Sequence, residues 1–163
     1  MIKEVKNVLK KEEAAQLKHD LTSNTFPWFI KKGIVNNTDT NYQFVHNFYD
    51  EFKFNSDRYH LIHPVSFAIN PSSIIRIKSN LLPRAEKIIE HEMHTDIPFA
   101  KNHKTAIYYV NTNNGYTKFE DGTKISSEEN KLVIFEGNME HTGTTCTDED
   151  YRIVINFNYF ESV

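Results

Sequence analysis

The stretch Tyr151–Phe160, YRIVINFNYF, decides the fold because two kinds of side chain alternate along its length. On an extended strand, one face would carry a cation, an apolar residue and two amides: Arg152, Val154, Asn156 and Asn158. The other face would be wholly apolar: Ile153, Ile155, Phe157 and Tyr159. The apolar face predicts a packed core, and the polar face predicts a cavity whose buried cation needs a partner. A dicarboxylate ligand would supply one, because a guanidinium binds a carboxylate through two parallel hydrogen bonds.

Short β-rich segments precede this stretch: Thr105–Asn111, Tyr116–Phe119 and Leu132–Phe135. Asn114-Gly115 and Asp121-Gly122 are dipeptides typical of hairpin turns, so they predict turns between these strands. Within the first segment, Tyr109 lies on one face with Ile107 and Asn111, and its hydroxyl is a candidate donor to a ligand carboxylate.

The first half of the chain shows helical patterns as well. The predicted elements are a strand within residues 2–9, a helix over Lys11–Thr22, a loop over 30–42, a strand over Tyr42–Tyr49, a helix over Tyr59–Asn70 and a strand over Ile74–Lys78. No good N-cap residue precedes the first helix, and Pro64 weakens the second. Helices therefore come early and an antiparallel sheet comes late, which indicates an α+β domain that is mainly β and closes into a sandwich or barrel.

Composition limits the class of protein. The chain has 163 residues, a mass of 19.1 kDa and a net charge of −3, which fits one domain and does not favour a nucleic-acid surface. No apolar run is long enough to span a membrane, and residues 1–15 lack the apolar core of a secretory signal. Cys146 is the single cysteine, so no internal disulfide forms and we expect a cytoplasmic protein.

Three features together suggest a metal site. In an extended His94-Thr95-Asp96, the imidazole and the carboxylate point to the same side. His141 and Arg152 follow, each beside a predicted strand. Two histidines and one carboxylate occupy one face of an octahedral ion and leave positions open for a co-substrate and oxygen, as in non-haem Fe(II) oxygenases.

Each residue also has a simpler interpretation. His-x-Asp pairs are common, His141 fits a surface turn, and Arg152 could pair with an acidic neighbour such as Asp148 or Asp150. His91-Glu92-Met93-His94 lacks the H-E-x-x-H spacing of zinc proteases. His91 is still a candidate for an extra metal ligand, and hydrolysis with zinc at the same site is an alternative function. Nothing indicates a nucleophilic Cys146.

The region from His94 to Phe160 resembles the prolyl-4-hydroxylase-like branch of the 2-oxoglutarate/Fe(II)-dependent dioxygenases. The family pattern H-x-D…H…R/K matches His94, Asp96, His141 and Arg152. The stretches 106–111, 113–119 and 130–135 resemble the strand with a tyrosine, the hairpin after it and the strand before the distal histidine. Residues 76–80 and 152–160 are most similar to small members encoded by bacteriophages.

The resemblance implies a double-stranded β-helix (jelly-roll or cupin-like) with N-terminal helices packed on the sheet. Residues 1–163 would form a single domain, with 1–70 as a helical support region and 71–163 as the β-helix core. The implied metal ligands and catalytic residues are His94, Asp96 and His141. The implied 2-oxoglutarate contacts are Arg152, Tyr109 and Asn156, and no tyrosine matches the one that some members place before the first histidine, where Arg76, Lys78 and Asn80 are candidates.

The implied activity is hydroxylation of a C–H bond with Fe(II), 2-oxoglutarate and O2, with ascorbate as a candidate reductant. Peptidyl proline or another amino-acid residue is the favoured substrate, and a small molecule stays open. A catalytically silent β-barrel binding module is the alternative. Leu81–Glu92 fits a flap over the site and a solvated loop equally well. If the protein is phage-encoded, we expect it to act in the host cytoplasm.

Overall fold

The computed structural model describes residues 1–34 and 41–161. In chain order its elements are β1 (Lys3–Lys6), α1 (Lys11–Leu21), β2 (Phe29–Lys32), β3 (Tyr42–Asp50), β4 (Lys53–Phe54), the 3₁₀ turn η1 (Tyr59–Ile62), α2 (His63–Ile69), β5 (Ser73–Pro83), β6 (Lys104–Tyr109), β7 (Asn113–Phe119), β8 (Lys124–Ser127), β9 (Lys131–Glu136), β10 (His141–Gly143) and β11 (Tyr151–Phe160).

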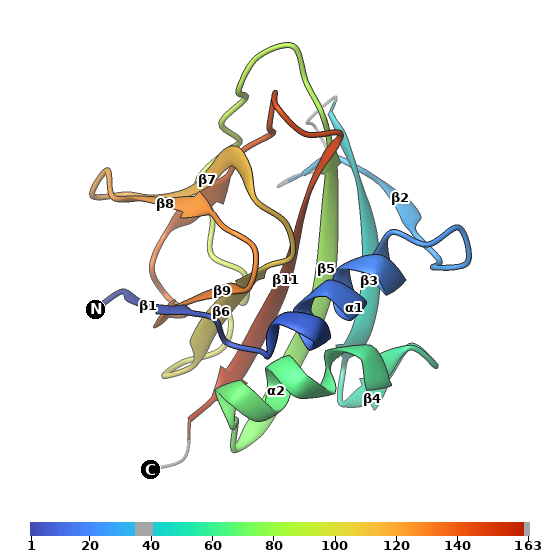
Figure 1. Ribbon diagram of the computed structural model, residues 1–163. Helices are drawn as coiled ribbons and strands as arrows, with labels where there is room; N and C mark the ends of the chain where they lie inside the picture. Colours follow the sequence, from blue (N-terminus) through green and yellow to red (C-terminus); the bar gives the residue numbers. More distant parts are fainter. Residues whose placement is uncertain (35–40, 162–163) are drawn as a thin grey trace.

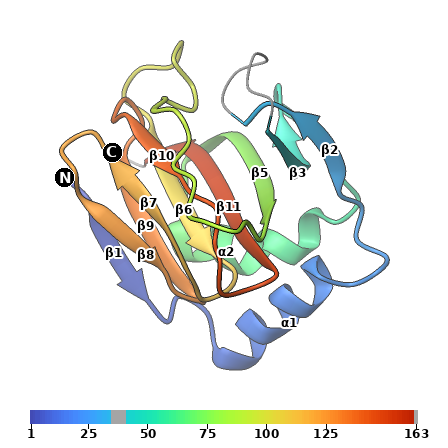
Figure 2. The ribbon, with the colours of Figure 1, turned by 90° about the horizontal axis from the view of Figure 1, so that it is seen from above.

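Two antiparallel sheets form the body of the molecule (Figures 1 and 2). The large sheet has the strand order β1-β9-β6-β11-β5-β3-β2, with β4 paired to β3, and the small sheet has the order β10-β7-β8. Helices α1 and α2 lie together along one face of the large sheet (Figure 1). The fold is therefore a mainly β double-stranded β-helix with helices packed on a sheet, which confirms the predicted fold class.

Strand β11 contributes to two separate cores, and this explains its alternating sequence. Ile153, Ile155 and Phe157 belong to the core between the large sheet and the helices, together with Leu17 of α1. Val154 faces the other way, into the core between the two sheets. The predicted two-faced strand is thus confirmed, and its bounds are those of the sequence pattern.

The N-terminal half differs from the prediction in detail. Helix α1 has no capping side chain before it, and the backbone N–H of Lys10 instead donates to the Glu13 carboxylate (3.1 Å). The loop predicted over residues 30–42 was wrong at its start, because Phe29–Lys32 is strand β2, paired with β3. Residues 35–40 of that loop lie outside the described residues. Strand β2 is short and half of its residues are basic, so its sequence carries little strand signal.

Of the two predicted hairpin turns, one is confirmed and one is wrong. Asp121 and Gly122 form the turn between β7 and β8, where Gly122 has the left-handed φ of 86° that favours glycine. Asn114-Gly115 instead lies within β7, at a register shift in the β7–β8 pairing. The Asn114 side chain bonds to the Thr147 backbone N–H (2.9 Å), so tertiary contacts override the local turn signal.

Strands from the first seventy residues are part of the large sheet. Strand β1 pairs with β9 at one end of the sheet, and β3 pairs with β5 near the other. Strand β5 is longer than predicted and runs on to Pro83. No helix in the described part of the chain combines the length and the apolar character that crossing a membrane requires.

Candidate metal and dicarboxylate site

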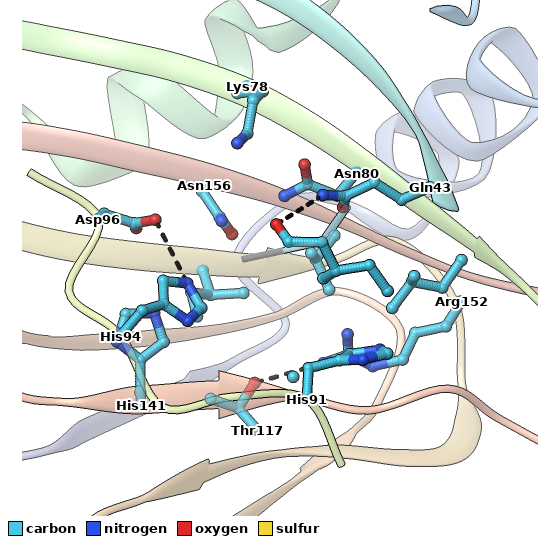
Figure 3. Close-up of a pocket in the computed structure, with 15 residues that line it drawn as sticks. Gln43, Lys78, Asn80, His91, His94, Asp96, Thr117, His141, Arg152 and Asn156 are labelled. Carbon is cyan, nitrogen blue, oxygen red and sulfur yellow. Dashed lines mark hydrogen bonds and ion pairs between the residues drawn. The ribbon is translucent and has the colours of Figure 1, made fainter. Parts of the chain in front are cut away.

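A pocket lies between the inner face of the large sheet and the small sheet (Figure 3). Strands β5 and β11 form one wall, because alternate residues of paired strands point to the same face. The labelled lining residues are Gln43, Lys78, Asn80, His91, His94, Asp96, Thr117, His141, Arg152 and Asn156.

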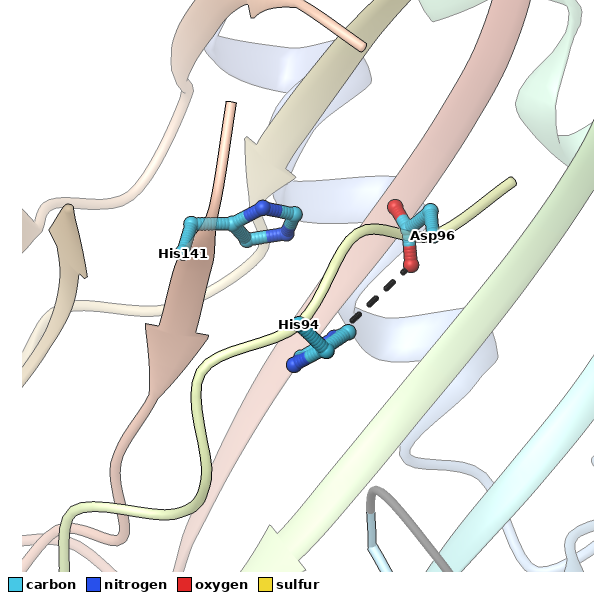
Figure 4. Close-up of side chains that lie close together, drawn as sticks. All are labelled: His94, Asp96 and His141. Atoms are coloured by element: carbon cyan, nitrogen blue, oxygen red, sulfur yellow. Dashed lines mark ion pairs between the residues drawn. The ribbon is translucent and has the colours of Figure 1, made fainter. Parts of the chain in front are cut away.

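His94, Asp96 and His141 come together at one end of this pocket (Figure 4). Each offers one ligand atom, and these atoms lie within 4.8 Å of one another. Two backbone hydrogen bonds between His94 and His141, both 3.0 Å, join the segment after β5 to β10 and hold the two imidazoles side by side. The two histidines are 47 positions apart in the sequence, and this β-bridge places them side by side.

Both imidazoles are oriented for ligation through Nε2. The Nδ1 atom of His94 lies 3.2 Å from the Glu92 carbonyl oxygen, and that of His141 lies 3.2 Å from the Met139 carbonyl oxygen. A carbonyl accepts only from a protonated nitrogen, so each Nδ1–H donates, and in the neutral imidazole this tautomer leaves the Nε2 lone pair for a metal. Burial lowers the pKa of His141, which favours the neutral imidazole that binds metals.

Asp96 is buried and ionised. Its Oδ1 accepts from Arg76 Nη2 (3.0 Å) and its Oδ2 from Asn158 Nδ2 (3.1 Å). Burial alone would raise the pKa of Asp96, but the Arg76 guanidinium, the nearby His141 and the Asn158 amide together hold it well below its usual range. Arg76 and Asn158 were not predicted for this role, and the inward-facing positions of β5 and β11 were the signal that could have indicated it.

Arg152 enters the pocket from β11 and is almost fully buried, with 3% of its surface exposed. Its Nε donates to Ser127 Oγ (2.9 Å) and its Nη2 to Thr117 Oγ1 (3.3 Å). Among residues 1–34 and 41–161 it forms no ion pair with a carboxylate, and Asp150 pairs with Arg84 instead. A buried guanidinium that bonds only to hydroxyls keeps donors available for an anion.

The structure places Tyr109 beneath Arg152 and outside the pocket lining. Its hydroxyl donates to Thr117 Oγ1 (2.8 Å), the same atom that accepts from Arg152. Tyr109 is fully buried, and burial raises its pKa to about 12, so it stays protonated. Thr117 lines the pocket at the place where the sequence suggested Tyr109. The sequence did not indicate Thr117, because a threonine within a strand carries no distinctive pattern.

Asn156 lines the centre of the pocket wall, and its buried Oδ1 has no hydrogen-bond partner. Its register partner on β5 is Lys78, and Asn80 follows two residues later on the same face. Asn80 Oδ1 is buried and unpartnered as well. Polar groups without partners thus continue along the wall between the metal-site end and the Arg152 end (Figure 3).

The remaining candidates lie apart from this arrangement. His91 lines the pocket but does not belong to the group of three ligand atoms. Cys146 is buried, and burial raises its pKa, so its thiol is not activated.

Residues Arg84–His91 are pinned to the small sheet, and this bears on the flap interpretation. Backbone hydrogen bonds run from Ala85 N to Cys146 O (3.0 Å), from Thr145 N to Ile89 O (3.2 Å) and from His91 N to Gly143 O (3.3 Å). We call this stretch the strap, since it runs antiparallel beside the end of β10 and the residues that follow it, 143–146.

Glu90 anchors the strap by its side chain. The carboxylate accepts from the Tyr116 hydroxyl (2.6 Å) and from Lys118 Nζ (2.7 Å), both on β7. These bonds hold the pKa of Glu90 at about 2. Glu90 is thus tied to β7 at the protein surface, and a flap would have to break this anchor to open.

Comparison with known proteins gives a result for structure only. No protein-family model matches the sequence, and no curated protein matches it. Solved structures do match. An oxidoreductase of the 2OG-Fe(II) oxygenase family from Burkholderia pseudomallei superposes with a TM-score of 0.70 over 97% of this chain and 84% of that one, at 11% identity. The fold is that of the 2-oxoglutarate/Fe(II) oxygenases.

Two prolyl hydroxylases share this oxygenase fold. One, from Trichoplax adhaerens in complex with a hypoxia inducible factor peptide fragment, has a TM-score of 0.69 and 13% identity over 98% of this chain and 83% of that one. The other, a Pseudomonas putida prolyl-4-hydroxylase, has a TM-score of 0.60 and 11% identity over 99% and 92%. The predicted resemblance to prolyl-hydroxylase-like oxygenases is confirmed at the level of structure; the resemblance to phage-encoded members stays a prediction.

The residues present fit the metal and co-substrate that this oxygenase fold implies. Two imidazoles and a carboxylate are the donor set of non-haem Fe(II) oxygenases. At the opposite end, a buried guanidinium without a carboxylate partner fits the distal carboxylate of 2-oxoglutarate.

Proposed function

We propose that this protein is a 2-oxoglutarate- and Fe(II)-dependent dioxygenase that hydroxylates a C–H bond of an amino acid or amino-acid residue, as a single domain over residues 1–163. One observation carries the proposal: the His94, Asp96 and His141 ligand atoms and the buried Arg152 face one pocket from opposite ends. The oxygenase fold, and the prolyl hydroxylases that share it, support the same conclusion.

Each residue has a defined task in this proposal. His94, Asp96 and His141 would hold Fe(II), which when bound with 2-oxoglutarate and O2 supplies the oxidising chemistry. Arg152 binds the distal carboxylate of 2-oxoglutarate, while Ser127 and Thr117 fix the plane of its guanidinium. Ascorbate is the proposed reductant that returns oxidised iron to Fe(II).

Positioning residues support these contacts. Tyr109 holds the Thr117 hydroxyl, and so keeps it in place beneath the guanidinium. Arg76 and Asn158 keep the Asp96 carboxylate ionised and fixed. Ile107 and Val154 give the pocket apolar lining between the polar ends, which excludes water and strengthens the charge interactions within it. Asn156 is placed to donate or accept beside the co-substrate.

The proposal is tested by anaerobic titration of the protein with Fe(II), with and without 2-oxoglutarate. A weak visible charge-transfer band that needs both components is expected, together with saturable 2-oxoglutarate binding in calorimetry. Arg152→Gln should weaken 2-oxoglutarate binding by about ten- to a hundredfold, because hydrogen bonds to charged groups are stronger than neutral ones, and leave metal binding unchanged. His94→Ala should abolish the band.

Two other functions are separated by the same titration. A silent binding module would show no band and no 2-oxoglutarate binding, and either result alone would reject the dioxygenase. A zinc hydrolase would bind Zn(II) at the same ligands without any response to 2-oxoglutarate.

A further inference from the structure

We propose that the substrate is a free or N-acylated amino acid whose carboxylate binds Lys78. This inference rests on the proposed dioxygenase function and assigns Lys78, a candidate 2-oxoglutarate contact by sequence, to the substrate instead. It also narrows the proposed substrate from any amino acid or amino-acid residue to amino acids that carry a free carboxylate.

The position of Lys78 follows from the register of β5 and β11. Lys78 pairs with Asn156, and Leu82 pairs with Arg152, so the two cations lie four residues apart along the same wall. That separation is about 13 Å along a strand. Figure 3 shows the Lys78 ammonium pointing into the pocket near Asp96 and Asn156, while Arg152 lies at the other end. One five-carbon dicarboxylate held by Arg152 therefore leaves Lys78 at the metal-site end.

The ammonium of Lys78 lies near the Asp96 carboxylate but does not pair with it. Within the described ranges, residues 1–34 and 41–161, its ammonium has neither a hydrogen bond nor an ion pair. The Asp96 oxygens bond to Arg76 and Asn158 instead. Lys78 is partly buried in the pocket wall, and an ammonium without a partner in such a place indicates a ligand.

Two neighbouring amides show the same lack of partners. The Oδ1 atoms of Asn156 and Asn80 are buried without hydrogen bonds, and Asn156 is only 8% exposed. Their amide groups flank Lys78 along the wall. An ammonium between two amides can bind a carboxylate through one charged and further neutral hydrogen bonds, with each amide rotated to present its N–H.

The charges indicate that this anion comes from the substrate. A divalent metal ion and a doubly charged dicarboxylate cancel each other, and Arg76 cancels Asp96. Arg152 and Lys78 then leave the loaded pocket with two positive charges. The proximal carboxylate of bound 2-oxoglutarate would be taken up by the metal, so a substrate carboxylate is the group that would neutralise Lys78. An internal peptide residue with a neutral side chain brings no carboxylate. An N-acylated amino acid brings one negative charge, and a free amino acid brings its carboxylate together with an ammonium group.

The test uses the full-length protein loaded anaerobically with Fe(II) and 2-oxoglutarate. Three panels are titrated: the twenty free amino acids, their N-acetyl derivatives, which keep the carboxylate, and their carboxamides, which lack it. Binding is measured as a change in the charge-transfer band and, with redox-silent Zn(II) in place of iron, by calorimetry. Both are equilibrium measurements that need no turnover.

At least one compound with a free carboxylate should bind, and its carboxamide should bind at least about tenfold more weakly. Lys78→Gln should weaken that binding by a similar factor while the 2-oxoglutarate affinity changes less than about twofold, and Lys78→Arg should restore part of it. Lys3→Gln, a charge change on exposed β1, is the matched control and should leave both affinities unchanged.

Three results would overturn the inference. In the first, carboxamides bind as well as acids, or no compound with a carboxylate binds. In the second, Lys78→Gln leaves acid binding unchanged. In the third, Lys78→Gln weakens 2-oxoglutarate as strongly as Arg152→Gln does, which would make Lys78 a co-substrate contact. Loss of the proposed function itself is distinguishable, since it would remove the Fe(II)/2-oxoglutarate band before any panel is added.

Discussion

Lys78 and Arg152 face the same pocket from neighbouring strands, yet their environments differ. Arg152 is buried but bonds to two hydroxyls, whereas Lys78 has no partner in the described part of the chain. The pKa of Lys78 is lowered to about 8, mainly by burial and then by the nearby cations Arg76 and Lys31, while the carboxylates of Asp96 and Asp50 oppose this shift. A charge that is held without compensation reduces stability, and this reduction can be measured.

Lys78→Met should therefore stabilise the ligand-free protein by about 2 kcal/mol near pH 7. Below pH 8 the lysine is charged in both the folded and the unfolded state, so the folded state bears the full desolvation penalty. Between pH 8 and its unfolded value of 10.5, the folded state loses the proton first and wild-type stability rises relative to the variant. Urea unfolding at pH 7 and pH 10.5 should show the difference shrinking, and a constant difference would contradict the explanation.

Substitution of Arg76, in contrast to that of Lys78, should lower the free energy of unfolding. Arg76→Gln leaves the buried Asp96 carboxylate without its cation, so unfolding free energy should fall by about 3 kcal/mol. A divalent metal supplies replacement charge at the same carboxylate. Thermal shifts with Mn(II) should consequently be larger for Arg76→Gln than for wild type. Equal shifts would mean that Asp96 does not bind the metal.

At the scale of elements, the strap over Arg84–His91 determines whether the site can open. Its backbone bonds to residues 143–146, at and after the end of β10, are supported by the contacts of Glu90 with Tyr116 and Lys118. Because Glu90 has a pKa lowered to about 2, its anchor persists throughout the neutral range and weakens only as pH falls through that value.

Glu90→Gln should speed amide hydrogen exchange in the strap several-fold at Ile89 and His91, whose N–H groups bond to Thr145 Oγ1 and Gly143 O. Exchange in the core of β11 should not change. Glu120→Gln, which removes an exposed carboxylate outside the strap, is the control. If the strap exchanges at the wild-type rate in Glu90→Gln, its backbone bonds alone hold it closed.

The same elements show what sequence could predict. The triad and the two faces of β11 depend on residue type and alternation, which are visible in the sequence. The turn predicted at Asn114-Gly115 was wrong because the backbone N–H of Thr147, far along the chain, donates a hydrogen bond to the Asn114 side chain. Thr117 was not predicted, and Arg76 was a candidate 2-oxoglutarate contact rather than a partner of Asp96. Both roles come from neighbours on other segments, a relation that local patterns do not contain.

At the scale of the whole molecule, binding and stability are linked. A ligand that binds only the folded state, present at a hundred times its dissociation constant, adds about 2.7 kcal/mol. For a chain of this length that corresponds to a rise in Tm of about 5–10 °C. Mn(II) and 2-oxoglutarate together should produce at least such a shift. Arg152→Gln should keep the metal contribution and lose that of 2-oxoglutarate; a full response in this variant would refute the assigned role of Arg152.

Two glycines border the Arg152 side chain. A methyl group at Gly115 would lie 2.7 Å from Arg152 Cδ and 2.8 Å from the Thr145 carbonyl oxygen, a backbone atom that cannot move aside. At Gly143 it would lie 3.3 Å from Arg152 Nη1, the end of a flexible side chain. For protein engineering, the two positions therefore differ in whether they can accept a larger residue. Libraries that aim at dicarboxylates of another chain length should vary residue 143, where a small displacement of the guanidinium is tolerable, and keep residue 115 as glycine.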